Sequence, residues 1–287
     1  MATAIIDGIT TRYEIRGTGT PLLMFSPGGF DATLDKWTSL ETYARVRILD
    51  RLSQHYLCIL FDRRETGQSG GRIEAVTWAH YARQGAGLLE HLGVARAHVV
   101  GGCMGCSCAI AFGVAYPNAT LSLLLWWPVG GARYRINGHR RFAEHIAYVN
   151  EHGLDAVVAL ARSTDKSFGQ DPRGGPWVSL LRRDGNFASV FVRQDVGGYT
   201  DIVVQMRDAL LDRDTAPGAT PEELLRLNIP ALIVPGHDAT HATSAARYLE
   251  ECLPAAQYWD VPLEQQTETT ARARLLEFLA SAAPSPA

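Results

Sequence analysis

Short apolar segments alternate with segments of helical period along most of the chain. The apolar segments are bounded by turn residues, and their length is typical of buried strands. They cover 22–25, 57–61, 98–100, 121–126 and 231–234. Apolar positions recur at helical spacing over 77–92, 104–115, 243–253 and 267–279. This alternation predicts βαβ units and an α/β fold, with a mostly parallel central sheet flanked by helices.

Two segments at the ends of this pattern predict further strands. Residues 5–16, followed by the turn-rich stretch 17–21, predict an antiparallel hairpin that leads into the first parallel strand. Near the other end, we interpret 258–264 as the last strand.

The regular alternation is interrupted over 128–228, where the pattern is mostly helical with breaks at 171–176 and 216–218. An insertion at the carboxyl edge of an open α/β sheet lies where such sheets bind ligands. We therefore expect a helical cap, or lid, inserted into a core formed by 1–127 and 229–287. An independent second domain is the alternative, but Pro and Gly form no linker at either junction.

The segment 97–131 contains no Lys, Arg, Asp or Glu, and a membrane-spanning helix would lack them too. A spanning helix needs about 20 continuous apolar residues, whereas Gly, Ser, Pro and Asn divide this segment. We interpret it as two buried strands with a buried helix between them. The start of the chain shows no basic region followed by an apolar one, so we expect no signal peptide, no membrane partner and a cytoplasmic location.

Composition narrows the classes of fold and partner. The chain has 27 Lys and Arg against 30 Asp and Glu, a net charge of -3, so we expect no nucleic-acid partner. Apolar residues make up 46% of the 287 residues, enough to bury a large core. Five cysteines are too few for a disulfide scaffold. Monomer and homo-oligomer both stay open.

The strongest chemical signal is the stretch 98–106, His-Val-Val-Gly-Gly-Cys-Met-Gly-Cys. A strand is followed by a sharp turn and a helix, with Gly101 and Gly105 two residues on either side of Cys103. Larger side chains at these two positions would collide across the turn. Cys103 also lies at a helix N-terminus, where the dipole favours thiolate over thiol. These features predict a nucleophilic cysteine.

Donors for a developing oxyanion are expected beside Cys103. The backbone N–H of Met104, the residue after the nucleophile, would point toward the oxyanion. The loop 26–29 follows the first parallel strand, and we expect Gly28 and Gly29 to supply the second donor.

These motifs resemble those of the α/β-hydrolase superfamily along nearly the whole chain. The loop 26–29 is similar to the family's His-Gly-Gly oxyanion loop, and 101–105 is similar to its nucleophile elbow. The segment 62–69 resembles its D-x-R-G-x-G-x-S turn, with Glu65 in place of a usual glycine. The insertion resembles the helical cap of the C–C-bond hydrolase, haloperoxidase and esterase branch. Dienelactone hydrolase also has a cysteine elbow, G-x-C-x-G-G, whereas this chain has Cys106 at the last glycine. The resemblance implies an α/β-hydrolase fold that works without a cofactor.

The acid and the base depart from the family pattern. The family's acid usually follows the strand after the cap in a Gly-x-x-Asp turn, but Asp238 lies one residue early and Ala239 takes the usual position. The family's histidine usually follows the last strand, but no histidine occurs after His241. One interpretation makes His241 the base, oriented by Asp238. It precedes the predicted helix 243–253, whose N-terminus would keep the imidazole neutral.

Two other interpretations stay open. In one, His237, or His139 from the cap, reaches Cys103. In the other no base exists, and the thiol works alone or the protein is not a hydrolase. A thiolate needs less activation than a serine, so we link the cysteine to the displaced histidine. Asp238 is equally explained as a turn-forming or helix-capping residue.

The other cysteines and four other histidines receive no catalytic role. Cys58, Cys108 and Cys252 lie inside predicted elements and are expected to pack in the core. Cys106 is either a resolving thiol or a small packing residue. No second cysteine pair follows, so we expect no metal site. Expected on solvated helix faces or ends are His55, His91, His145 and His152.

A basic cluster near the start of the predicted cap bears on the substrate. Its members are Arg133, Arg135, His139, Arg140 and Arg141, with no acid among them. At a pocket mouth such a cluster would bind a carboxylate or phosphate, and a solvated helix face is the alternative. The tryptophans at 126, 127 and 177 either line an apolar pocket or pack in the core. Our candidates for substrate binding are Trp127, Arg133, Arg135 and His237.

We expect a cofactor-independent hydrolase that acts on a small molecule with an ester, lactone, thioester or activated C–C bond. In this hypothesis Cys103 attacks the carbonyl and His241 shuttles protons. The alternatives are a lyase or acyltransferase on the same scaffold, or a non-catalytic small-ligand receptor, for which the absent C-terminal histidine argues.

Overall fold

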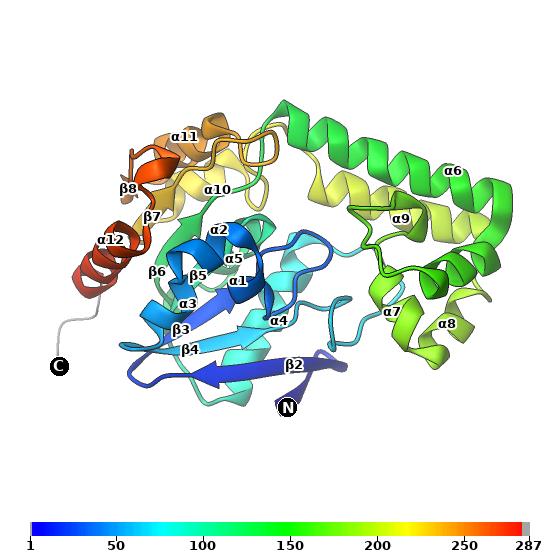
Figure 1. Cartoon of the computed structure of the whole chain (residues 1–287), viewed down its shortest axis with the longest axis horizontal. Helices are drawn as coiled ribbons and strands as arrows, with labels where there is room; N and C mark the ends of the chain where they lie inside the picture. Colours follow the sequence, from blue (N-terminus) through cyan, green and yellow to red (C-terminus); the bar gives the residue numbers. More distant parts are fainter. Residues whose placement is uncertain (1, 283–287) are drawn as a thin grey trace.

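The computed structural model describes residues 2–282, and its central feature is an eight-stranded sheet with helices on both faces (Figure 1). The strand order is β1-β2-β4-β3-β5-β6-β7-β8. The pairs β1–β2 and β2–β4 are antiparallel and the other pairs are parallel, which confirms the predicted fold class and the opening hairpin. The strands are β1 (Ala2–Ile6), β2 (Ile9–Arg16), β3 (Thr20–Phe25), β4 (Tyr56–Phe61), β5 (Ala97–Gly102), β6 (Thr120–Trp126), β7 (Ala231–Val234) and β8 (Ala256–Tyr258).

Alternating side chains of the sheet serve two separate cores. Leu23 and Phe25 of β3 face one core, while Leu22 and Met24 of the same strand face the other. The first core is covered by α4 (Trp78–His91), α5 (Met104–Ala115) and α11 (Thr243–Cys252). The second is covered by α12 (Glu268–Ser281) and by α1 (Lys36–Ser39), α2 (Glu41–Val46) and α3 (Ile48–Leu52). The four predicted helices are confirmed, whereas α1–α3 had not been predicted, since each is too short to show a period.

The charge-free stretch 97–131 lies inside the molecule. Every residue of β5 and β6 is buried, and so is most of α5. The interpretation as two buried strands around a buried helix is therefore confirmed. No helix within residues 2–282 is long and apolar enough to cross a membrane.

The last strand is shorter than expected and lies earlier in the chain. β8 pairs with β7 only over Ala256–Tyr258, so the prediction of a strand over 258–264 is wrong. Pro262 cannot donate a hydrogen bond to a sheet, and the 3-10 helix η3 (Leu263–Gln265) follows it directly. The fully buried Gln266 comes next, ahead of α12.

Helices occupy the interval between β6 and β7, and Figure 1 shows α6–α9 grouped to one side of the sheet. Glycines with positive φ lie in both predicted breaks, Gly175 at 73° and Gly218 at 123°. A third, Gly153 at 78°, interrupts α6. The helices are α6 (Ala132–Ser163), η2 (Pro172–Gly174), α7 (Val178–Arg183), α8 (Gly185–Phe191), α9 (Val196–Leu210) and α10 (Pro221–Arg226), with η1 (Pro117–Ala119) preceding β6.

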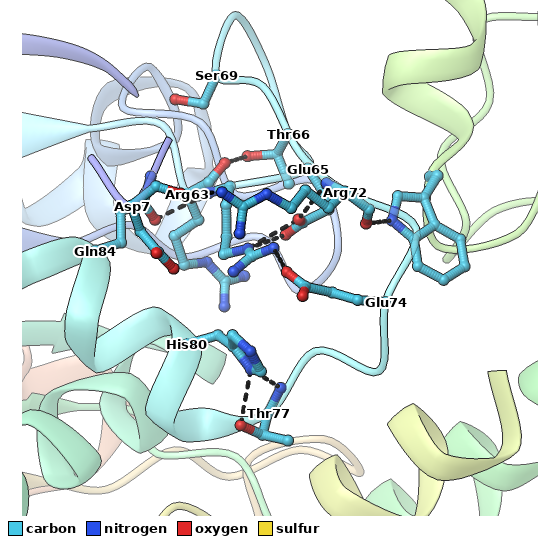
Figure 2. A network of polar contacts seen from close by, with 12 residues as sticks. Asp7, Arg63, Glu65, Thr66, Ser69, Arg72, Glu74, Thr77, His80 and Gln84 are labelled. Atoms are coloured by element: carbon cyan, nitrogen blue, oxygen red, sulfur yellow. Dashed lines mark hydrogen bonds and ion pairs between the residues drawn. The ribbon is translucent and has the colours of Figure 1, made fainter. Parts of the chain in front are cut away.

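Polar contacts stabilise the loop after β4 and connect it to this helical group (Figure 2). Glu65 has a φ of 67°, a left-handed conformation in which glycine is unstrained. Its carboxylate accepts a hydrogen bond from Arg64 Nε at 2.8 Å, and Arg64 also pairs with Glu74. Burial raises the pKa of Glu65 to about 7, although Arg64 opposes the rise. Farther along the loop, the carbonyl of Arg72 accepts a hydrogen bond from Trp177 Nε1 at 2.9 Å.

His145 is fully buried on α6, so the expectation of a solvated position is wrong. Its Nδ1 lies 2.9 Å from the Arg173 carbonyl oxygen and its Nε2 lies 2.6 Å from the Tyr199 hydroxyl, which joins α6 to η2 and α9. Phe142, His145 and Val149 are buried at helical spacing, and this stripe was the overlooked signal. Burial lowers the pKa of His145 to about 4.

We expect His145→Gln to destabilise the protein more at about pH 7.5 than at about pH 5. The folded pKa of about 4 lies below the ordinary 6.5, so the stability that neutral His145 contributes is present above 6.5 and is lost as the pH falls toward 4. At pH 5 this loss is about 2 kcal/mol. Urea unfolding at both pH values measures the difference, with the exposed His152→Gln as control. An equal effect at both pH values would contradict the burial of a neutral imidazole.

Candidate active site

Cys103 occupies the sharp turn between β5 and α5. Its φ of 54° and ψ of -127° are unusual for a residue with a side chain, so the turn is strained. The turn forms because its flanking glycines allow close approach. A Cβ on Gly101 would collide with the backbone of Cys106, and a Cβ on Gly105 would collide with the carbonyl of Phe25 in β3. The second collision is thus with the neighbouring strand and not across the turn.

His241 and Asp238 come together in the loop between β7 and α11. His241 Nδ1 lies 2.8 Å from Asp238 Oδ2. The other carboxylate oxygen accepts hydrogen bonds from the backbone N–H groups of Thr240 at 2.7 Å and His241 at 2.9 Å. Asp238 therefore shapes the turn and orients the imidazole at once. Within residues 2–282, the buried Nε2 of His241 has no hydrogen-bond partner of ordinary geometry, which leaves it available to the Cys103 sulfur.

The surroundings of Cys103 and His241 favour a thiolate beside an imidazolium. Burial opposes a charge on Cys103, but the polar interaction with His241 and its charge outweigh burial, so the pKa of Cys103 lies below its ordinary value. Burial also opposes a charge on His241, yet Cys103 and then Asp238 raise its pKa to about 9. This raised pKa contradicts the expectation that His241 stays neutral, because Cys103 and Asp238 are adjacent negative groups that favour the charged imidazole.

The other candidate bases do not meet Cys103. His237 is exposed, with Nδ1 3.4 Å from Thr243 Oγ1. His139 has Nε2 3.2 Å from the Leu211 carbonyl oxygen. Neither lines the cavity next to Cys103. Of the three imidazoles, that of His241 is the one that interacts with the Cys103 sulfur, and His237 has no place at the substrate.

Trp127 packs behind His241 instead of lining the cavity, contrary to its assignment to substrate binding. The two ring centroids are 5.5 Å apart. Trp127 Nε1 donates to Gln266 Oε1 at 2.8 Å, and Gln266 Nε2 donates to the Pro235 carbonyl at 3.1 Å. A Cβ on Gly236 would collide with His241. The segment after β8 thus contributes a glutamine that braces the histidine's surroundings, where the family usually has the histidine itself.

The loop after β3 lies against Cys103. The backbone N–H groups of Met104 and Gly28 are the ones that interact with its sulfur. Gly28 and Gly29 have φ of 116° and 61°, which glycine adopts without strain. Arg63, 1% exposed, donates to the Gly29 carbonyl and thereby holds this loop.

Arg63 also explains one of the buried cysteines. Its Nη1 lies 3.4 Å from Cys108 Sγ, and its guanidinium carbon lies 4.9 Å from the ring centroid of Tyr81. Arg63 is the second residue after β4. This position did not predict its contact with Cys108, because sequence spacing does not tell which way the side chain points.

Cys58, Cys108 and Cys252 are buried, as expected, and Cys106 is buried too. The Cys106 thiol donates to the carbonyl oxygens of Gly101 at 3.1 Å and Trp126 at 3.4 Å. Burial raises its pKa well above the ordinary value, which favours a packing role over a resolving thiol. In the described part of the chain, no three side chains of His, Cys, Asp or Glu gather as metal ligands would.

A cavity of about 190 Å³ opens beside Cys103. Of the basic cluster on α6, Arg141 lines this cavity, together with Tyr134. Arg133 is exposed and Arg135 Nε donates to the Leu211 carbonyl at 3.1 Å, so neither fits its assignment to substrate binding. Tyr134 and Arg141 are seven residues apart, two helical turns, and this spacing was the signal for the face that meets the cavity.

The pKa shifts predict rapid alkylation of Cys103 at neutral pH. Iodoacetamide should modify it faster than an ordinary thiol, and the rate should decline only as acid protonates the sulfur. His241→Gln should lower the rate at pH 7 by about tenfold or more, because the thiolate loses its compensating charge. Intact-mass spectrometry of timed reactions measures both rates, with Cys103→Ala giving the background from other thiols. Equal rates in the wild type and His241→Gln would rule out the charged pair.

Solved structures share this architecture. An enol-lactonase from Burkholderia xenovorans LB400 superimposes with a TM-score of 0.61 and 20% identity, over 97% of this chain and 100% of its own. A meta-cleavage product hydrolase from Pseudomonas fluorescens IP01 gives a TM-score of 0.60 and 18% identity, over 99% of this chain and 98% of its own. At such identities the likeness shows the fold alone.

Sequence comparison adds partial relatives and a family. The dihydrolipoyllysine-residue acetyltransferase component of the acetoin cleaving system from Cupriavidus necator is 35% identical over 127 residues, 44% of this chain and 32% of the relative. This match therefore spans about a third of that protein's length. The family model described as alpha/beta hydrolase fold matches residues 21–260, which include Cys103, Asp238 and His241. The chain belongs to the α/β-hydrolase fold family.

Proposed function

We propose that this protein is a cofactor-independent hydrolase that uses Cys103 as its nucleophile on a small-molecule ester, thioester or lactone. The observation that carries the proposal is the position of Cys103, in a strained turn beside a cavity, next to a histidine oriented by Asp238. Membership of the α/β-hydrolase fold family supports it, as do the hydrolytic activities by which the enol-lactonase and the meta-cleavage product hydrolase of the same fold are named.

Acylation begins with attack of the Cys103 thiolate on the carbonyl carbon, which forms an S–C bond and puts negative charge on the carbonyl oxygen. The N–H groups of Met104 and of the loop at Gly28 and Gly29 stabilise this oxyanion. As the intermediate collapses, the bond to the leaving group breaks and the His241 imidazolium donates its Nε2 proton to the departing oxygen or sulfur. The products of this half-reaction are a thioester on Cys103 and a neutral imidazole.

Deacylation uses the imidazole that the first step leaves neutral. His241 takes a proton from water, and the hydroxide attacks the thioester carbonyl. Collapse of the second intermediate expels the Cys103 thiolate and frees the acid, so the thiolate–imidazolium pair is restored. Asp238 holds Nδ1 throughout, which keeps Nε2 directed to the reaction.

The helices inserted between β6 and β7 act in this proposal as a cap. α6 contributes Tyr134 and Arg141 to the cavity, and Phe168 from the following loop adds an apolar side chain. These residues cover the carboxyl end of the sheet, where they shield the acyl group from bulk water.

Acyl transfer is the second candidate. A thioester on Cys103 is open to attack by an acceptor thiol or amine as well as by water, and the partial relative from Cupriavidus necator is described as an acetyltransferase component. Added thiol or amine acceptors that become acylated faster than the ester is hydrolysed would favour this candidate. The receptor hypothesis rests on the absent C-terminal histidine. In the proposed mechanism His241 takes the role of that histidine, so its absence does not argue against an enzyme.

We expect p-nitrophenyl acetate to acylate Cys103 and to be turned over. Intact-mass spectrometry of the quenched reaction should show a mass gain of one acetyl group, absent in Cys103→Ala. Cys103→Ala and His241→Gln should lower kcat/KM by at least about 10³-fold and 10²-fold respectively.

Cys252→Ala, which removes a buried thiol far along the chain from the turn, serves as the matched control and should keep its activity. Full activity of Cys103→Ala would refute the proposed nucleophile.

A further inference from the structure

The cavity beside Cys103 combines an aromatic wall with a positive charge. Phe30 and Phe168 line it, and their rings pack edge to face with each other and with Phe142 at centroid separations of 5.1 to 5.6 Å. Arg141 lines the same cavity. A ligand that fits therefore needs both an apolar segment and a group that an arginine can bind.

Arg141 has no partner of its own in the described part of the chain. Its guanidinium makes no hydrogen bond and no ion pair within residues 2–282. Asp31, a carboxylate that lines the same cavity, pairs instead with Lys36 Nζ at 2.9 Å. Apart from the candidate nucleophile and its histidine, the cavity therefore contains one positive charge without a partner within residues 2–282, that of Arg141.

Cys103, Tyr134 and Arg141 all line this one cavity, so the cation and the reacting sulfur belong to one site. Burial is the main cause that raises the pKa of the Tyr134 phenol; the charge of Cys103 adds to the rise and the charge of Arg141 opposes it. One short ligand can meet Cys103 at one end and Arg141 at the other.

We infer that the substrate carries a carboxylate on its acyl chain and that Arg141 binds this carboxylate. The inference rests on the proposed function, since it names the substrate class for Cys103. A planar guanidinium binds a carboxylate through two parallel N–H groups. The cavity of about 190 Å³ is small, so we take the acyl chain to be short, of about glutarate size. Its methylene groups pack against Phe30 and Phe168.

Two p-nitrophenyl esters with acyl chains of equal length test this specificity. The mono-p-nitrophenyl ester of glutaric acid carries a carboxylate, and p-nitrophenyl pentanoate carries a methyl group in its place. After subtraction of the enzyme-free rates, the wild type should prefer the anionic ester in kcat/KM by about tenfold or more.

Substitution of Arg141 should remove this preference selectively. Arg141→Gln should lower kcat/KM for the anionic ester by about 10- to 100-fold and change that of the neutral ester by less than about twofold. Arg141→Lys, which keeps the charge and loses the planar fork, should lie between. The matched control is Arg140→Gln, which removes the same charge from the exposed neighbour on α6. Equal losses on both esters in Arg141→Gln would overturn the inference.

Alkylation of Cys103 provides a second reading that needs no hydrolysis. In the wild type, the rate with N-iodoacetyl-β-alanine relative to that with its neutral amide should exceed the same ratio in Arg141→Gln by about fivefold or more. If neither ester is hydrolysed but this ratio depends on Arg141, the proposed function fails and the anion site stands. If esters are hydrolysed and Arg141→Gln changes neither ratio, the anion site fails and the proposed function stands.

Discussion

A thiolate at the half-buried Cys103 needs a positive charge beside it, and the interaction between Cys103 and His241 depends on several separate parts of the fold. The sulfur is presented by a turn that requires glycine at 101 and 105. The imidazole comes from a different loop, after β7, where Asp238 holds its Nδ1. Behind it, Trp127 at the end of β6 and Gln266 ahead of α12 form a hydrogen-bonded brace. The carboxyl ends of parallel strands meet at one edge of the sheet, and this topology brings the parts together.

Much of the fold was predictable because strands buried on both faces leave a strong signal. Runs such as 121–126 and the charge-free stretch around α5 correspond to strands and a helix sealed inside the molecule. The helices α1–α3 were missed because helices of four to six residues carry no period, although they bury Trp37 and Tyr43. The end of β8 was misplaced because its pairing with β7, and not the local composition, sets its length.

The candidate site was partly predictable. The sharp turn at Cys103 was predictable from a local steric pattern, and the contact between Asp238 and His241 from the short loop that holds them. The predicted neutral state of His241 disagrees with its raised pKa. That pKa depends on Cys103, which is distant in the sequence and could not be taken into account from the loop alone. Of the basic cluster, Arg141 lines the cavity, because the face of α6 that carries Tyr134 and Arg141 is the one that meets it. Gln266 and Arg63 left no sequence signal, because their contacts join segments far apart in the chain.

The ionisation state of His241 tests the central claim most directly. In protein labelled with ¹⁵N-histidine, the ring nitrogen shifts of His241, assigned by loss of its signals in His241→Gln, report protonation as the pH is raised. The thiolate–imidazolium pair predicts that both nitrogens carry protons at neutral pH and that one proton is lost near pH 9. It also predicts a lower pKa in Cys103→Ala, where Asp238 remains as the negative partner. A neutral imidazole at pH 7 in the wild type, or the same pKa with and without the sulfur, would contradict the account.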